Sequence, residues 1–179
     1  MRYQKGLPSM RSEILARQVM AQIRRANRRF WRIVHFSIQA THLHLIAEVE
    51  SAGELARAMK GFRVRVAKAV NAVLRRRGVV SSGRYHVHAL RTPRETRHAI
   101  AYVLRNASKH GALRQGWDPW SSAAWFDGWS APLERLADVY RRRVALPVAT
   151  PRTWLLAVGW RRHGPVPAAA PSVTAEPSG

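Results

Sequence analysis

Two short motifs in this sequence hold side chains that could cleave a phosphodiester. His42 and His44 flank a single leucine, and Tyr102 lies one helical turn before Asn106 in a later segment. Two imidazoles and a third, oxygen ligand can hold a divalent metal ion, and a tyrosine hydroxyl can attack phosphorus. The chain therefore carries the side chains needed for metal-assisted nucleophilic chemistry, provided that the fold brings the two motifs together.

The two histidines lie in a predicted strand, residues 41–50. Leucines alternate with His42 and His44, so the leucines should face the core and both imidazoles should point to the other side. Glu48 and Glu50 share the histidine face, where they could support metal ligands or simply be solvated. A His-x-His pair also occurs on solvent-facing edge strands, so the motif alone does not establish a metal site.

A second pair, His86 and His88, has the same spacing in a predicted strand over residues 84–91. Tyr85 precedes this pair, and no acidic residue is close to it in the sequence. The pair could face DNA, form a second set of ligands or be an inert surface. Its spacing does not choose between these functions.

The helix that carries Tyr102 begins with a capping box, Thr92–Glu95, in which proline takes the favoured first position. Tyr102, Asn106 and Lys109 fall on one stripe, separate from the apolar face. A tyrosine inside a helix usually packs in the core, but this stripe lies off the apolar face. Asn106 is a poor helix former and would also suit the end of the helix.

The charge of the chain points to a polyanionic partner. Its 179 residues include 31 Lys and Arg against 10 Asp and Glu, which gives a formal net charge of +21. Nucleic acid is the leading class of partner, and an anionic membrane surface is the second. The absence of cysteine excludes disulfides, zinc thiolates and cysteine nucleophiles. No apolar run reaches the length of a membrane span, which predicts a soluble, cytoplasmic protein. No long basic amphipathic anchor stands out either, so we expect nucleic acid and no membrane as the partner.

Basic residues along the predicted helices and the last predicted strand are the candidates for contacts with DNA phosphates. Such side chains are usually only solvated, and it is the overall charge that favours phosphate contacts here. The candidates are Arg57, Lys60, Arg65, Lys68, Arg84, Arg105 and Lys109.

The order of the predicted elements indicates an α+β fold. Its body resembles a ferredoxin-like split βαβ sheet with an added helix that bears the tyrosine, followed by a Trp-rich helical C-terminal segment. The first strand of such a sheet is central, so a stub over residues 1–5 predicts marginal stability or a truncated reading of a longer protein. The other predicted elements are a helix at 10–26, strands at 30–39, 41–50 and 84–91, a long helix capped at Ser51–Glu54 and the helix that begins at Thr92.

We expect three regions along the chain. Residues 1–112 form the main domain, residues 113–163 a helical extension and residues 164–179 a disordered tail rich in Pro, Ala and Ser. Most tryptophans follow Gly116, with a helix predicted over residues 133–143. A tryptophan cluster is more often a small hydrophobic core than a base-stacking platform, although its arginine neighbours leave stacking open.

Together these motifs resemble those of the REP-associated tyrosine transposases, which belong to the single-tyrosine HUH transposases. His42-Leu43-His44 matches the His-hydrophobe-His motif of that superfamily. The segments Thr92–Glu95 and Tyr102–Asn106 resemble the family's tyrosine block, and residues 117–129 and 153–160 resemble its C-terminal segment. The likeness covers roughly residues 6–164. The ordered set of motifs is fairly specific, whereas the His-x-His motif alone is not.

The resemblance implies a role for each candidate residue. His42 and His44 match the metal ligands, which favours this pair over the later one, and Asn106 occupies the place of a third, amide ligand. Tyr102 matches the nucleophile. The implied activity is cleavage and rejoining of single-stranded DNA near hairpin-forming, REP-like repeats, with Mg²⁺ or Mn²⁺, through a 5′-phosphotyrosine. The protein would act as a monomer or homodimer.

Two other functions stay open at this point. A rolling-circle replication initiator also places its tyrosine after the His-x-His motif, whereas relaxases usually place it before. A non-catalytic, basic ferredoxin-like module that binds nucleic acid would need the charge but none of the chemistry. A covalent adduct between tyrosine and DNA would separate the enzymes from the module.

Overall fold

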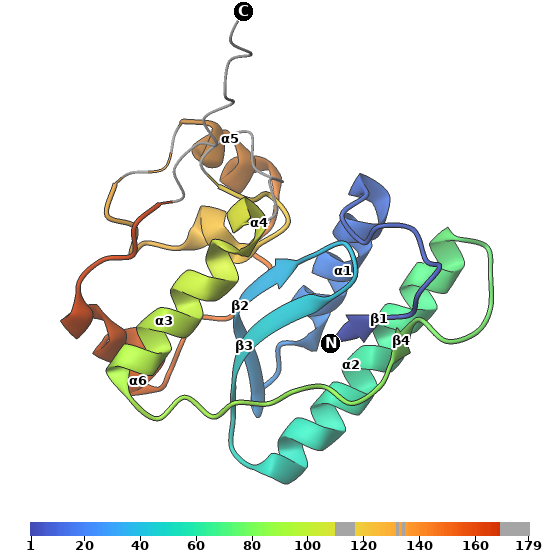
Figure 1. The fold of residues 1–179 in the computed structure, drawn as a ribbon, viewed down its shortest axis with the longest axis horizontal. Coiled ribbons are helices and arrows are strands. Elements are labelled where there is room, and N and C mark those ends of the chain that lie inside the picture. Colours follow the sequence, from blue (N-terminus) through green and yellow to red (C-terminus); the bar gives the residue numbers. More distant parts are fainter. Residues whose placement is uncertain (110–116, 132, 134, 169–179) are drawn as a thin grey trace, which may run out of the picture.

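The computed structural model describes residues 1–109, 117–131, 133 and 135–168. Figure 1 shows the arrangement of the helices and strands. In chain order these are β1 (Arg2–Tyr3), α1 (Glu13–Ala26), β2 (Trp31–Ile38), β3 (Leu43–Val49), α2 (Ala52–Val73), β4 (Ser81–Ser82), α3 (Pro93–Leu104), α4 (Asn106–Lys109), the 3₁₀ helix η1 (Ser122–Trp125), α5 (Arg135–Arg143), α6 (Trp154–Ala157) and the 3₁₀ helix η2 (Gly159–His163).

The strands form two small antiparallel sheets in a mixed α+β fold. β2 pairs with β3, and β1 pairs with β4. The two sheets meet where the Tyr3 N–H donates to the Thr41 carbonyl and the Leu43 N–H donates to the Met1 carbonyl, each at 2.8 Å. The described strands therefore do not make the continuous ferredoxin-like sheet expected from the sequence, because β1 and β4 have only 2 residues each.

The prediction of a strand over residues 84–91 is wrong. β4 ends at Ser82, and the chain then runs as a loop up to α3. Gly83 adopts a positive φ of 72°, which turns the backbone out of the extended conformation. Val87, His86 and His88 are all exposed, so no buried face holds this stretch in a sheet.

A β-bulge in β2 sets the direction of its side chains. Val34 is an extra residue between Ile33 and His35, which pair with successive residues of β3. Simple alternation would place Val34 on the same face as Phe36 and Ile38. In the structure, Val34 packs on the opposite side of the strand from those two residues, because the bulge changes the phase of the alternation.

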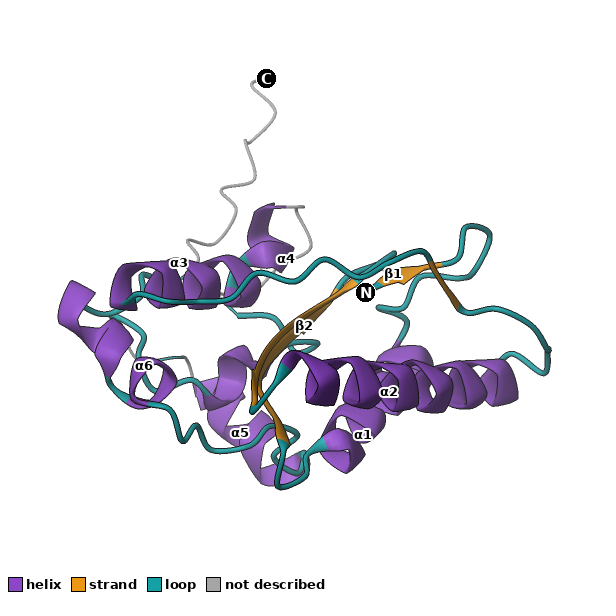
Figure 2. Cartoon of the chain, turned by 90° about the horizontal axis from the view of Figure 1, so that it is seen from below, coloured by secondary structure: helices purple, strands orange, loops and turns teal. Residues whose placement is uncertain are grey.

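Hydrophobic cores cover both faces of the β2–β3 hairpin. Figure 2 shows α1 and α2 on one side of the strands and α3 on the other. Leu43 belongs to the core under α1 and α2, whereas Ile46 packs with Ile100 of α3 and with Trp160. The histidine face of β3 is therefore not an open surface, as strand alternation alone would suggest, because the C-terminal half of the chain covers much of it.

The segment after α4 is tied to the hairpin by polar contacts. Asp118 is fully buried and accepts two hydrogen bonds from the Arg11 guanidinium, at 2.9 and 3.0 Å. The Ile38 N–H donates to the Trp120 carbonyl at the end of β2. A buried carboxylate needs such a partner, so this ion pair helps to fix the segment against β2.

Part of the predicted disordered tail is ordered. Val166 is buried, and it pairs with Trp129 through backbone hydrogen bonds to Gly128 and Ser130. Composition alone misses this pairing, because it depends on a partner far away in the sequence. Residues 169–179 lie outside the described part of the chain.

Candidate functional site

Three aromatic side chains from β3 and α3 lie together. The ring centroids of His42 and His44 are 4.7 Å apart with an interplanar angle of 89°, and those of His44 and Tyr102 are 5.3 Å apart with an angle of 85°. Two of the three predicted ligands and the predicted nucleophile are thus neighbours in space, although the histidines and the tyrosine are far apart in the chain. The other histidine pair, in the loop before α3, is not part of this cluster.

Local structure explains the meeting of the rings. His42 and His44 fall on the same side of the chain because strand residues alternate, and an isolated backbone bridge between Arg2 and His42 extends the pairing to the start of β3. Thr92 and Glu95 form the predicted capping box at the start of α3. This helix packs on the histidine side of the hairpin and brings Tyr102 over the strand.

Tyr102 is accessible to a large substrate. It is 47% exposed, so its phenol is not a packed core group. The ring of His44 supports one side of it, while Val103 and Ile100 of the same helix are buried. A partly exposed tyrosine beside a histidine can act as a nucleophile on a large substrate.

Asn106 is placed differently from the prediction of one continuous helical stripe. α3 ends at Leu104, Arg105 leaves the helical conformation with ψ of 4°, and Asn106 begins α4. Asn106 is only 2% exposed, and its Oδ1 has no hydrogen-bond partner among the described residues. The turn at Arg105 draws Asn106 into the protein, whereas Tyr102 stays at the surface.

The donor set suits a hard divalent cation. Two imidazoles and one amide oxygen would leave coordination positions for water or phosphate oxygens, and the buried Oδ1 of Asn106 accepts no hydrogen bond from the described residues. The described residues hold no group of three or more His, Cys, Asp or Glu that could bind a metal by itself. A metal bound by His42 and His44 would therefore need a further ligand that is not one of these residue types, and Asn106 is the candidate that the sequence offers.

Glu48, which shares the histidine face, has a structural role. Its carboxylate accepts hydrogen bonds from the Arg152 N–H at 2.9 Å and from the Thr153 N–H and hydroxyl at 2.7 and 2.8 Å, and it lies 3.6 Å from the Arg32 Nε. It is a buried anchor for the chain before α6, not a solvated acid or a metal ligand. No local pattern in the sequence reveals this contact. Glu50, in contrast, is exposed.

The candidate DNA-binding residues lie on more than one side of the molecule. Arg57, Lys60 and Lys68 are exposed along α2, and Arg57 forms an ion pair with Glu54. Arg84 is exposed in the loop after β4. The three positions on α2 lie on the side of the hairpin opposite the helix that carries Tyr102.

The remaining basic candidates are less exposed. Arg65 is half-buried, and burial together with the nearby Arg28 lowers the pKa of its guanidinium. Arg105 is half-buried at the turn after α3. The side chain of Lys109 lies outside the described residues. The fold therefore does not place the predicted basic residues together on a single surface.

The comparisons with known proteins identify no family. No protein-family model matches the chain, and neither the search of curated proteins nor the search of solved structures finds a significant match. None of the helices among the described residues is long and apolar enough to cross a membrane. The function must therefore be argued from the site itself.

Proposed function

We propose that this protein is a metal-dependent endonuclease that cleaves and rejoins single-stranded DNA with Tyr102, in the manner of the single-tyrosine HUH transposases. The contact between the rings of Tyr102 and His44 carries the proposal, since it joins the nucleophile to the His-x-His motif. The net charge of +21 supports a polyanionic substrate. Hairpin-forming DNA beside REP-like repeats is the proposed target, and the protein would act as a monomer or homodimer.

The chemistry would proceed without a nucleotide cofactor. The Tyr102 oxygen attacks the phosphorus and loses its proton to solvent, the bond from phosphorus to the 3′ oxygen breaks, and that oxygen takes up a proton. A 5′-phosphotyrosine and a free 3′-OH result. Attack by a 3′-OH on the phosphotyrosine reverses these steps, so the energy of the phosphodiester is conserved and rejoining needs no external source.

His42, His44 and Asn106 are the residues that would hold Mg²⁺ or Mn²⁺. Bound there, the ion would supply Lewis-acid polarisation of a non-bridging phosphate oxygen. The buried Oδ1 of Asn106, for which the described residues supply no hydrogen-bond donor, supports this assignment. Two imidazole ligands favour Mn²⁺ over Mg²⁺ in vitro.

A ferredoxin-like sheet is part of this proposal. Backbone hydrogen bonds join Met1 and Tyr3 to the start of β3, and β1 also pairs with β4. The strand order would then be β4-β1-β3-β2, with α1 and α2 on one face, which is the arrangement of a split βαβ fold. In this arrangement the His-x-His motif lies on the face opposite the two crossover helices.

An adduct assay tests the proposed function. A labelled single-stranded hairpin DNA is incubated with the protein, with Mn²⁺ or with EDTA, and covalent complexes are separated under denaturing conditions. We expect an adduct only with the metal, and its loss in the Tyr102→Phe variant with binding retained. Tyr85→Phe is the matched control and should form the adduct. Binding without any adduct would instead identify a non-catalytic DNA-binding module.

A further inference from the structure

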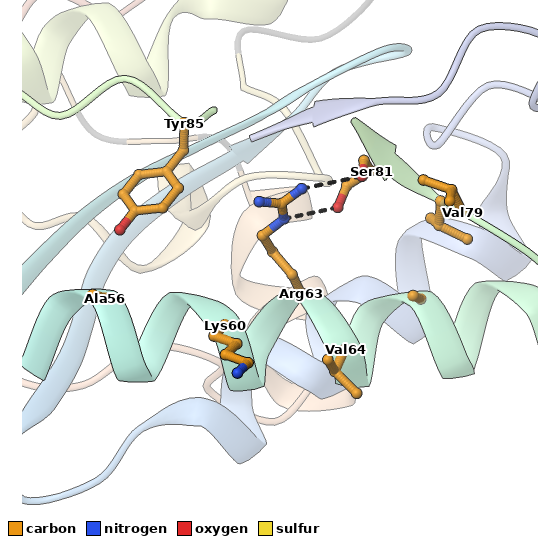
Figure 3. A pocket seen from close by; sticks show the side chains of 9 residues that line it. Ala56, Lys60, Arg63, Val64, Val79, Ser81 and Tyr85 are labelled. Carbon is orange, nitrogen blue, oxygen red and sulfur yellow. Dashed lines mark hydrogen bonds between the residues drawn. The ribbon is translucent and has the colours of Figure 1, made fainter. Parts of the chain in front are cut away.

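A pocket that is open to solvent lies between α2 and the segment that follows it. Figure 3 shows Tyr85 hanging over one end of the pocket, Val79 at the other end and Arg63 between them. Its volume is about 340 Å³, which lies at the lower end of the range for small-ligand sites. The pocket is lined by residues of α2, whereas Tyr102 belongs to α3, and these two helices lie on opposite sides of the hairpin.

The lining combines an aromatic ring, exposed aliphatic groups and two cations. Tyr85 is partly buried against the core under α1 and α2, and Val79 is 61% exposed. Arg63 donates from Nε to the Ser81 hydroxyl at 3.0 Å and from Nη2 to the Ser81 carbonyl at 3.1 Å, which fixes its guanidinium in the wall. Lys60 is exposed at the rim, and none of the lining residues is acidic.

From this combination we infer that the pocket binds one nucleotide of a single-stranded DNA, with the base against Tyr85 and the phosphate beside Lys60. Every base has a π-face that can stack on a tyrosine ring, whatever the sequence. The ammonium of Lys60 is a mobile point charge suited to a phosphate. The inference rests on the proposed function only in taking single-stranded DNA as the ligand, and it requires no cleavage.

The lining favours a nucleotide over other anions. A carboxylate or inorganic phosphate would use the cations but would leave the tyrosine ring and the exposed valines without a partner. A nucleotide offers both a flat apolar surface and a charge, at a spacing that a pocket of this size can span. Since a free mononucleotide has the same chemistry as a nucleotide within a strand, the test must separate these two sources.

A pair of variants, each of which introduces one negative charge, tests the pocket without disturbing the core. Val79→Glu places a carboxylate at the pocket wall, whereas Val87→Glu makes the same change outside it, at a residue that is similarly exposed, 59% against 61%. We expect Val79→Glu to weaken binding of fluorescein-labelled oligo(dT) about tenfold by fluorescence anisotropy, and Val87→Glu by less than about threefold. Equal affinities of the two variants would overturn the inference.

Photocrosslinking locates the base. Oligo(dT) that contains 5-iododeoxyuridine is irradiated with the protein, and the crosslinked peptide is mapped by mass spectrometry. We expect the crosslink at Tyr85, and we expect Tyr85→Ala to bind roughly five- to a hundredfold more weakly while Tyr85→Phe binds as the wild type does. A crosslink confined to residues outside the pocket would overturn the inference even if Tyr85→Ala fails to fold.

A competition arm separates the two sources of the nucleotide. We expect free dTMP to displace the oligonucleotide poorly when the two are compared at equal nucleotide concentration. Equal displacement would assign the pocket to mononucleotides and would overturn binding of a strand. The outcome of the adduct assay is independent of the pocket test. Even if the wild-type protein forms no adduct, the Val79→Glu and Val87→Glu variants can still differ in their affinity for DNA.

Discussion

Asn106 is buried, unlike His42 and His44, and its Oδ1 accepts no hydrogen bond from the part of the chain that the structure describes. An acceptor that is left unsatisfied in a protein interior costs free energy of folding, about 1–3 kcal/mol. Such a cost is tolerated at functional sites, where the group has a partner that the protein alone does not supply. The residue thus gives the clearest test of whether a metal binds beside the two histidines.

We predict that Asn106→Asp lowers the melting temperature in EDTA and increases the gain from Mn²⁺. A buried carboxylate without a partner destabilises the folded state, but it is a stronger ligand for a hard cation than an amide. Binding to the folded state alone then raises the melting temperature, by about 3 °C more than in the wild type at millimolar Mn²⁺.

Asn71→Asp is the matched control for this experiment. Asn71 also has an Oδ1 without a hydrogen-bond partner among the described residues, but it lies on α2, away from the histidines. We expect no additional gain from Mn²⁺ in this variant. Equal gains in both variants would argue that the carboxylate binds metal non-specifically.

A buried histidine predicts a dependence of stability on pH. His35 is buried, with its ring 5.5 Å from that of Phe126, which belongs to the core beside α3. Burial lowers the pKa of His35 from 6.5 to about 4, although Asp127 opposes the shift. The unfolded chain therefore binds a proton that the folded protein excludes, so stability falls as the pH drops from 6.5 toward 4, by about 3 kcal/mol, and is unaffected by this group above pH 6.5.

Urea unfolding at several pH values measures this effect. His35→Gln should reduce the loss of stability between pH 6.5 and 4, because no imidazole is then available to take up the proton. His88→Gln removes an exposed histidine and should keep the wild-type dependence, since His35 is still present. A wild-type dependence in His35→Gln would show that other groups, such as the buried carboxylates, cause the acid sensitivity.

At the scale of elements, Glu48 connects β3 to α6. Its carboxylate holds the backbone of Arg152 and Thr153 just before that helix, which then packs near α3. We predict that Glu48→Ala lowers the free energy of unfolding by about 3 kcal/mol, because it removes the acceptor of these hydrogen bonds and leaves the largely buried Arg32 guanidinium without its carboxylate. Hydrogen exchange should show faster exchange of residues 152–163 than of α1.

Glu50→Ala is the control for Glu48→Ala. Glu50 follows β3 and is exposed, so its removal should change the free energy of unfolding by less than about 0.5 kcal/mol. Similar losses in the two variants would contradict an anchoring role for Glu48.

Much of the element order follows from local signals in the sequence. Ser51 accepts from the Glu54 N–H at the start of α2, and the Thr92 capping box starts α3, so these two helices begin where their caps predict. Local signals fail where distant partners decide the structure. Residues 84–91 have strand-like alternation but form a loop. In β2, the bulge turns Val34 to the face opposite the one that simple alternation predicts.

The candidate site shows the same division between local and distant information. The alternation of His42 and His44 and the helical phase of Tyr102 are local, and the fold brings these rings together. The burial of Asn106 depends on the turn at Arg105 and on the core beside it, which no helical stripe predicts. The role of Glu48 depends on a segment that lies far along the chain.

At the scale of the whole molecule, the charge sets how DNA would be bound. The chain has 31 basic residues and 10 acidic ones, so ion pairs within the protein can neutralise only a minority of its cations. Exposed lysines of α2 and the open phenol on α3 lie on opposite sides of the hairpin. A strand that reaches both places would pass many cations, so contacts with the phosphate backbone should dominate its affinity.

We therefore predict that binding of single-stranded DNA is strongly dependent on salt. Neutralising about six to ten phosphates releases condensed counterions, so the affinity should fall about a thousandfold or more between roughly 50 and 200 mM salt. Fluorescence anisotropy with a hairpin DNA measures the slope. Lys60→Gln and Lys68→Gln should each lower the slope of log affinity against log salt concentration by about one or less. Only Lys60→Gln should also weaken crosslinking in the pocket beside Tyr85. A flat response to salt would contradict an interface led by phosphate contacts, and stronger binding to anionic lipid vesicles than to DNA would identify a membrane surface as the partner instead.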